Sequence, residues 1–179
     1  MKRFVTAIII AIWCGAVFAQ DVPNVPVQEP AMTTERLAQI VKVLDPEVIA
    51  RGPALEFTLD DIPIIVISDA RADRMRAMVP IASVEGLDKA DLLRLMQANF
   101  DAALDARYAV AHGRLWGVFI HPLSPLEKDQ FLSGLVQVLT VAKTYGTGYT
   151  GGAAIFGGGD SNGIYQELLE KLRKKGEAL

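Results

Sequence analysis

Residues 107–121 decide the fold, and they read RYAVAHGRLWGVFIH. Segments 107–111 and 114–121 are predicted to be two strands, joined by a short hairpin turn at His112 and Gly113. Side chains of the second strand alternate between two faces, with Leu115 and Phe119 on one and Trp116, Val118 and Ile120 on the other. Because both faces are apolar, this strand is expected to lie inside a sheet and to be covered on both sides.

Three more strands are predicted before this hairpin. Segment 55–59 alternates apolar and polar residues, and 62–67 is the returning strand after a turn at Asp60 and Asp61. A third strand is expected over 75–84.

Three helices are predicted around these strands. The first is capped by Thr33 or Thr34, and Pro46 ends it. Its apolar stripe consists of Leu37, Ile40, Val41 and Leu44. The second begins at Asp88, and its expected packing side consists of Leu92, Leu93, Met96, Phe100, Ala103 and Leu104. The third is expected to start at Ser124-Pro125-Leu126-Glu127, with Ser124 as the cap, and to run to Tyr145.

Both ends of the chain differ from this body in composition. Residues 1–19 combine Lys2 and Arg3 with an apolar run that ends in small residues, which is typical of a secretory signal peptide cleaved after Ala19. An uncleaved N-terminal anchor is the alternative. Residues 20–32 form a proline-rich tether, 146–163 a glycine-rich linker, and 164–179 a tail with one short helix.

Charge and cysteine content exclude several classes of function. The 179 residues carry 18 basic and 21 acidic side chains, so nucleic acid is not an expected partner. The one cysteine, Cys14, lies in the predicted signal and would leave with it, which excludes thiol catalysis. After cleavage, the acidic chain is expected to be soluble in the periplasm or outside the cell, without stable membrane insertion.

No motif predicts an active site, a cofactor or a metal. Gly146–Gly151 has the glycine spacing of a dinucleotide-binding loop but follows a helix instead of a strand. His112 and His121 are too few ligands for zinc, and no acidic cluster completes a set. Ser124 near His121 lacks the strand-to-helix elbow of a hydrolase nucleophile, and its hydroxyl is expected to cap a helix. We therefore expect a protein without catalytic, cofactor or metal residues.

The order helix, three strands, helix, two strands, helix predicts an α+β domain over 33–145 with a twisted antiparallel sheet. Within this order, three stretches carry a family resemblance. They are the segment 91–100, DLLRLMQANF, the hairpin turn with Leu115-Trp116 after it, and the HPLS sequence at 121–124. The pattern resembles the class I type III secretion chaperones and their YbjN-like relatives. This resemblance implies a small acidic dimer that binds unfolded segments of exported proteins through apolar patches, without catalysis.

The chain departs from that family by its predicted export signal and its glycine-rich tail, so the fold can carry over without the same partner. If helices cover one face of the sheet, an apolar patch remains on the other, and we expect it to be a partner or dimer interface or part of the core. It consists of Tyr108, Trp116, Val118 and Ile120.

The resulting hypothesis is an exported, non-catalytic, homodimeric module that binds a partner protein or extended peptide segments. The alternative is a structural or signalling subunit of the cell envelope, docked through its glycine-rich tail and terminal helix.

Overall fold

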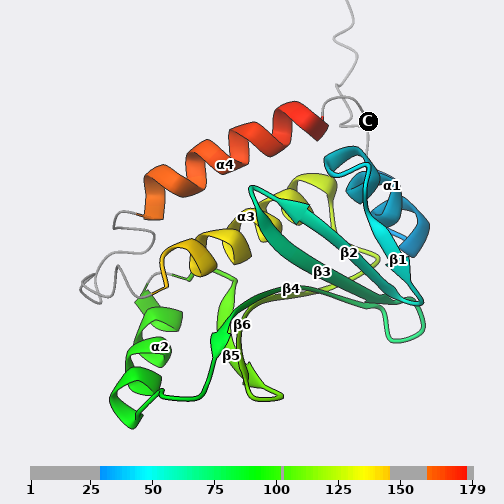
Figure 1. Ribbon diagram of the computed structural model, residues 1–179. Helices are drawn as coiled ribbons and strands as arrows, with labels where there is room; N and C mark the ends of the chain where they lie inside the picture. The colour runs from blue at the N-terminus through cyan, green and yellow to red at the C-terminus, as the bar shows by residue number, and fades with distance from the viewer. Residues whose placement is uncertain (1–28, 102, 146–160, 177–179) are drawn as a thin grey trace, which may run out of the picture.

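A computed structural model describes residues 29–101, 103–145 and 161–176 of the chain (Figure 1). Within these ranges the chain forms four helices and one six-stranded sheet, which confirms the predicted α+β fold. The elements in chain order are α1 (Thr34–Leu44), β1 (Ile49–Arg51), β2 (Ala54–Leu59), β3 (Ile62–Asp69), β4 (Arg74–Ser83), α2 (Lys89–Asp101), β5 (Arg107–Ala111), β6 (Arg114–Pro122), α3 (Lys128–Lys143) and α4 (Ser161–Gly176).

The sheet is antiparallel throughout, with the order β1-β2-β3-β4-β6-β5. The central strand β6 pairs with β4 on one side and with β5, its hairpin partner, on the other. The edge strand β1 was not predicted. Its three residues are all exposed, so it lacks the apolar alternation that indicates a strand from sequence.

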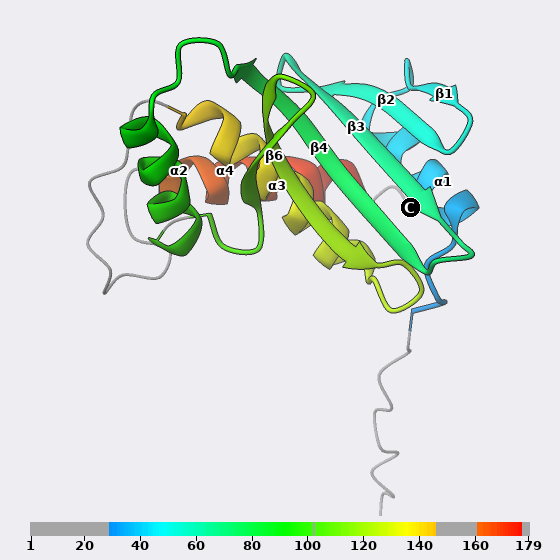
Figure 2. The same cartoon turned by 90° about the horizontal axis from the view of Figure 1, so that it is seen from below.

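Among the described residues, helices cover one face of this sheet and leave the other uncovered. In Figure 1, α3 lies between the sheet and α4, and α1 lies near β2. Figure 2 shows the opposite face, with α1, α3 and α4 behind the strands and α2 beside them. The core therefore lies between the sheet and α3, whose Phe131, Leu135 and Leu139 are completely buried.

The two predicted helix caps have different outcomes. Thr33 caps α1 as expected, because its hydroxyl oxygen accepts the N–H of Arg36 at 3.1 Å. Ser124 does not cap α3, which begins at Lys128 with Glu127 as its N-cap residue. Gln130 Oε1 accepts the Glu127 N–H at 3.0 Å, so a reciprocal cap three residues later takes over the predicted role.

The C-terminal helix α4 begins at Ser161, three residues before the predicted start at Ile164. Residues 146–160 of the predicted linker, like residues 1–28, lie outside the described ranges. The helix buries Leu168, Leu169 and Leu172 and contacts both α3 and α1. None of the helices in the described ranges is long and apolar enough to cross a bilayer.

One carboxylate ties α4 to the rest of the domain. Asp60, in the β2–β3 turn, forms ion pairs with Lys171 of α4 at 2.7 Å and with Lys143 at the end of α3. Hydrogen bonds from Lys143 and Lys171 lower the pKa of Asp60 from 3.8 to about 2. On the same helix, Lys175 donates to the Leu44 carbonyl oxygen at 3.2 Å.

Candidate functional site on the uncovered face of the sheet

An apolar patch occupies the middle of the uncovered face. Strand register brings Ile65, Met78 and Val118 into one row across β3, β4 and β6, while Ile67 and Ile120 flank Arg76 in the next row. Trp116 lies further along β6, opposite Pro80. Ile120 is 53% exposed and Ile67 is 36% exposed, and the other side chains are half-buried. We call Ile65, Ile67, Met78, Trp116, Val118 and Ile120 the open-face patch.

Three of the four predicted interface residues belong to this patch. Trp116, Val118 and Ile120 occupy alternate positions of β6, and Leu115 and Phe119 point to the covered face as the alternation predicts. The Trp116 ring is held at its polar end, because its Nε1–H donates to the Ala111 carbonyl oxygen at 3.1 Å. These placements agree with the predicted separation of the two faces of the strand.

The expectation that Tyr108 shares this face is wrong. Tyr108 is 5% exposed on the helix-covered side, where its hydroxyl donates to the Val141 carbonyl oxygen of α3 at 2.6 Å. It pairs with Gly117, whereas Arg107 and Ala109 occupy the open-face positions of β5. A two-residue hairpin turn at 112–113 already requires this register, so the sequence contained the signal that assigns Tyr108 to the other face.

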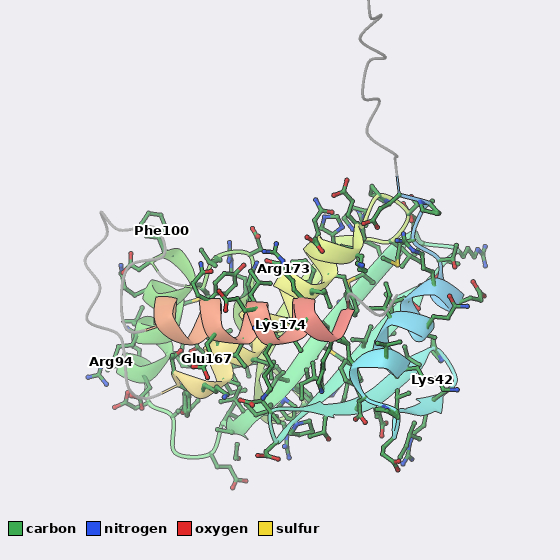
Figure 3. All side chains as sticks on the ribbon, turned by 90° about the horizontal axis from the view of Figure 1, so that it is seen from above. Lys42, Arg94, Phe100, Glu167, Arg173 and Lys174 are labelled. Atoms are coloured by element: carbon green, nitrogen blue, oxygen red, sulfur yellow. The ribbon has the colours of Figure 1, made fainter. Side chains whose placement is uncertain are left out.

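Helix α2 carries a second exposed apolar surface. Leu92, Met96 and Phe100 follow one another at intervals of four residues and are 42%, 55% and 66% exposed, and Leu93 beside them is 60% exposed. Figure 3 shows Phe100 on the outer side of α2, away from the rest of the domain. We call these four residues the α2 stripe. They were predicted to pack on the sheet, but the buried residues of α2 are Leu95 and Ala98.

The side chain of Asn99 determines how α2 sits against the sheet. Its Oδ1 accepts the N–H of Tyr108 at 2.6 Å, and its Nδ2 donates to the Tyr108 carbonyl oxygen at 3.2 Å. Asn99 therefore satisfies both main-chain groups of one residue at the β5 edge, as a neighbouring strand would. With α2 attached in this way, the α2 stripe faces outward.

A groove between α2 and β5 continues this exposed surface. Its volume is about 520 Å³, and its wall is almost entirely apolar. Its lining includes Leu95 and Met96 from α2, Val110 from β5 and Leu115 from β6. Val110 is itself 54% exposed.

The polar residues considered for chemistry do not converge. His112 is exposed in the hairpin turn with a φ of 51°, while the His121 ring stacks on Phe119 at the far end of β6. The Ser124 N–H donates to Asp73 at 2.7 Å and the Ser124 hydroxyl donates to it at 3.0 Å, and these two bonds lower the pKa of Asp73. In the described part of the chain, no three His, Cys, Asp or Glu side chains group as metal ligands.

Comparisons with known proteins give a likeness among solved structures. No protein-family model matches the chain, and no curated protein matches it significantly. Among solved structures, a chain of the ExsC–ExsE complex, which contains a type III secretion chaperone, is similar with a TM-score of 0.50 and 12% sequence identity. The likeness covers 64% of this chain and 93% of that chain. At this identity the comparison supports a secretion-chaperone-like fold.

Proposed function

We propose that this protein is an exported, non-catalytic module that binds extended segments of a partner protein on its open-face patch. The observation that carries the proposal is that apolar side chains from three adjacent strands share a face that no described helix covers. The side chains of Ile120 and Ile67 are exposed to solvent on this surface, and a contiguous exposed apolar surface of this kind marks an interaction site. The fold comparison supports the same class of role, since ExsC is seen in complex with ExsE.

The second part of the proposal is a homodimer through the α2 stripe. Its side chains belong to one helix, so two copies can pack them against each other around a twofold axis. The groove between α2 and β5 lies next to the stripe and can receive side chains of the second copy, such as Phe100. The open-face patch would then stay available to the partner.

The envelope-subunit alternative places the terminal helix on another protein. In the domain, however, Leu168, Leu169 and Leu172 are already buried against the chain itself, and Tyr165 hydrogen-bonds Ser133 at 2.8 Å. The apolar side of α4 is thus occupied. This favours the sheet face over α4 as the contact surface for a partner.

Site-directed photo-crosslinking tests the binding surface. A benzophenone amino acid replaces Val118 in the patch or, as the matched control, Lys174 on α4, whose side chain lies on the helix-covered side of the molecule (Figure 3). We expect irradiation of cells expressing the full chain to join position 118, and not 174, to one contiguous segment of another protein. Adducts only with a second copy would make the patch a dimer interface and contradict the proposal.

Export is tested separately by the mass of the mature chain. If residues 1–19 are removed as we propose, the protein recovered from outside the cytoplasm begins at Gln20. An intact Met1 in that fraction would contradict cleavage, and recovery in the cytoplasm alone would contradict export.

A further inference from the structure

The uncovered face of the sheet is basic although the whole chain is acidic. Strand register and alternation place five arginines on this face, from five different positions in four strands: Arg51, Arg74, Arg76, Arg107 and Arg114. The same face has two carboxylates, Glu56 and Asp69. The formal charge of the chain is −3, so positive charge is concentrated on the surface that carries the open-face patch.

Both carboxylates on this face are already engaged. Glu56 forms an ion pair with Arg51 at 3.2 Å, near the β1 edge of the sheet. Asp69 accepts the main-chain N–H groups of Arg71 and Ala72 at 2.9 and 3.0 Å, within its own turn. Neither group neutralises the centre of the face.

Arg76 occupies that centre. It is exposed, and its register partners on the two neighbouring strands are Ile67 and Ile120. In the described part of the chain, no carboxylate pairs with Arg76 or Arg114. A partner that covers Ile67 and Ile120 must therefore also remove water from the Arg76 guanidinium.

Removing that water is unfavourable unless the partner supplies a negative charge. An uncharged apolar segment would leave a desolvated cation without a counter-ion, whereas a carboxylate restores both its charge pairing and its hydrogen bonds. Aspartate and glutamate can also accept two parallel bonds from one guanidinium, which fixes the position of the bound segment.

We propose that the open-face patch selects extended segments in which acidic side chains are flanked by apolar ones, and that Arg76 receives the central carboxylate. This inference rests on the proposed function, because it names the chemistry of the segment bound by the same surface. Along an extended chain, side chains at alternate positions point to one side. Apolar, acidic and apolar residues at such positions meet Ile67, Arg76 and Ile120 in turn.

Labelled nine-residue peptides test this selectivity by fluorescence anisotropy with the full mature chain. One peptide has valine, aspartate and valine at its alternate positions 3, 5 and 7, with serine at all other positions, and the two matched peptides have asparagine or lysine in place of aspartate. We expect the aspartate peptide to bind at least about tenfold more tightly than the other two, because only it pairs with the guanidinium. Arg76→Gln is expected to remove this preference, and Arg76→Glu to turn it toward the lysine peptide.

Two controls separate charge at the site from charge in general. Lys174→Glu makes the same change of charge on α4 and is expected to leave the order of affinities unchanged. Ile120→Asp, in the patch itself, is expected to weaken binding of the aspartate peptide by repulsion and lost apolar contact. Equal affinity for all three peptides, or a preference that survives both Arg76 variants, would overturn the inference and leave peptide binding intact. If none of the peptides binds, binding of extended segments fails as well.

Discussion

Gly134 of α3 lies directly against the ring of Phe119 of β6, so that a Cβ atom at position 134 would come within 2.6 Å of two ring carbons. This contact lets the helix approach the central strand closely, and both residues are buried. Because of this close approach, the apolar residues on the covered side of β6 are buried, whereas those on its other side are half-buried or exposed.

Gly134→Ala is accordingly expected to destabilise the fold. Crowding of the Phe119 ring costs about 1–3 kcal/mol, and the higher helix propensity of alanine returns at most about 1 kcal/mol. Urea unfolding followed by circular dichroism measures the net loss. Adding Phe119→Leu removes the ring and should restore part of the lost stability. An unchanged midpoint for the single variant would show that α3 does not need this contact.

Tyr108→Phe tests whether the covered face acts independently of the open-face patch. The variant leaves the Val141 carbonyl oxygen without its 2.6 Å donor, which should reduce the free energy of unfolding by about 1–2 kcal/mol. Photo-crosslinking from position 118 should not change, since Tyr108 is on the opposite side of the sheet. Tyr165→Phe, the same change at a half-buried position, should cost less. A loss of crosslinking without a loss of stability would return Tyr108 to the interface.

The outcome for Tyr108 shows what sequence reasoning could and could not resolve. Strand β6 is long and its side chains point alternately to two faces, so the residues on each face can be assigned from sequence. The register across the two-residue turn extends that assignment to β5. The direction of the α2 stripe does not follow in this way. A helical pattern shows which residues share a side, but only tertiary contacts, here those of Asn99 with Tyr108, decide whether that side is covered.

The centre of the uncovered face could not be predicted from sequence for a related reason. Arg76 is seen beside Ile67 and Ile120 only once three strands are in register, since these residues are far apart in the chain. Taken singly, each is an ordinary strand residue. The three residues of the edge strand β1 are still harder to predict as a strand. None of them is buried, and they do not alternate between buried and exposed positions.

The α2 stripe predicts a change of oligomeric state. Met96→Asp combined with Phe100→Asp places two negative charges on the surface proposed to join two copies, and like charges at such an interface are strongly unfavourable. Light scattering after size exclusion should give twice the monomer mass for the mature chain and the monomer mass for the variant.

The fold itself should tolerate this pair of substitutions. Both side chains are exposed, 55% and 66% respectively, so thermal unfolding of the monomeric unit should change little. Ala90→Asp, in the first turn of α2 and outside the stripe, serves as the control and should remain dimeric. A monomeric unmodified chain would remove the α2 stripe from the proposal.

Acid should release the link between α4 and the β2–β3 turn. The ionised carboxylate of Asp60 is stabilised in the folded chain by Lys143 and Lys171, which lowers its pKa from 3.8 to about 2. A lowered folded-state pKa means that the ion pairs contribute their full stability above pH 3.8, and that this contribution disappears as the pH falls through about 2.

Asp60→Asn should therefore be less stable than the unmodified chain at pH 7, by no more than about 1 kcal/mol because the lysines are solvated. The difference should become small near pH 2, where about half of the Asp60 carboxyl groups in the folded chain are protonated. Asn also tolerates the positive φ of 53° at this position, so backbone strain does not confuse the comparison.

Asp61→Asn, at a φ of 63° and without an ion pair in the described part of the chain, is the matched control and should show a smaller pH-dependent difference. Thermal unfolding from pH 7 down to pH 2 tests the prediction, and a difference that does not depend on pH would show that the carboxylate charge of Asp60 does not hold α4.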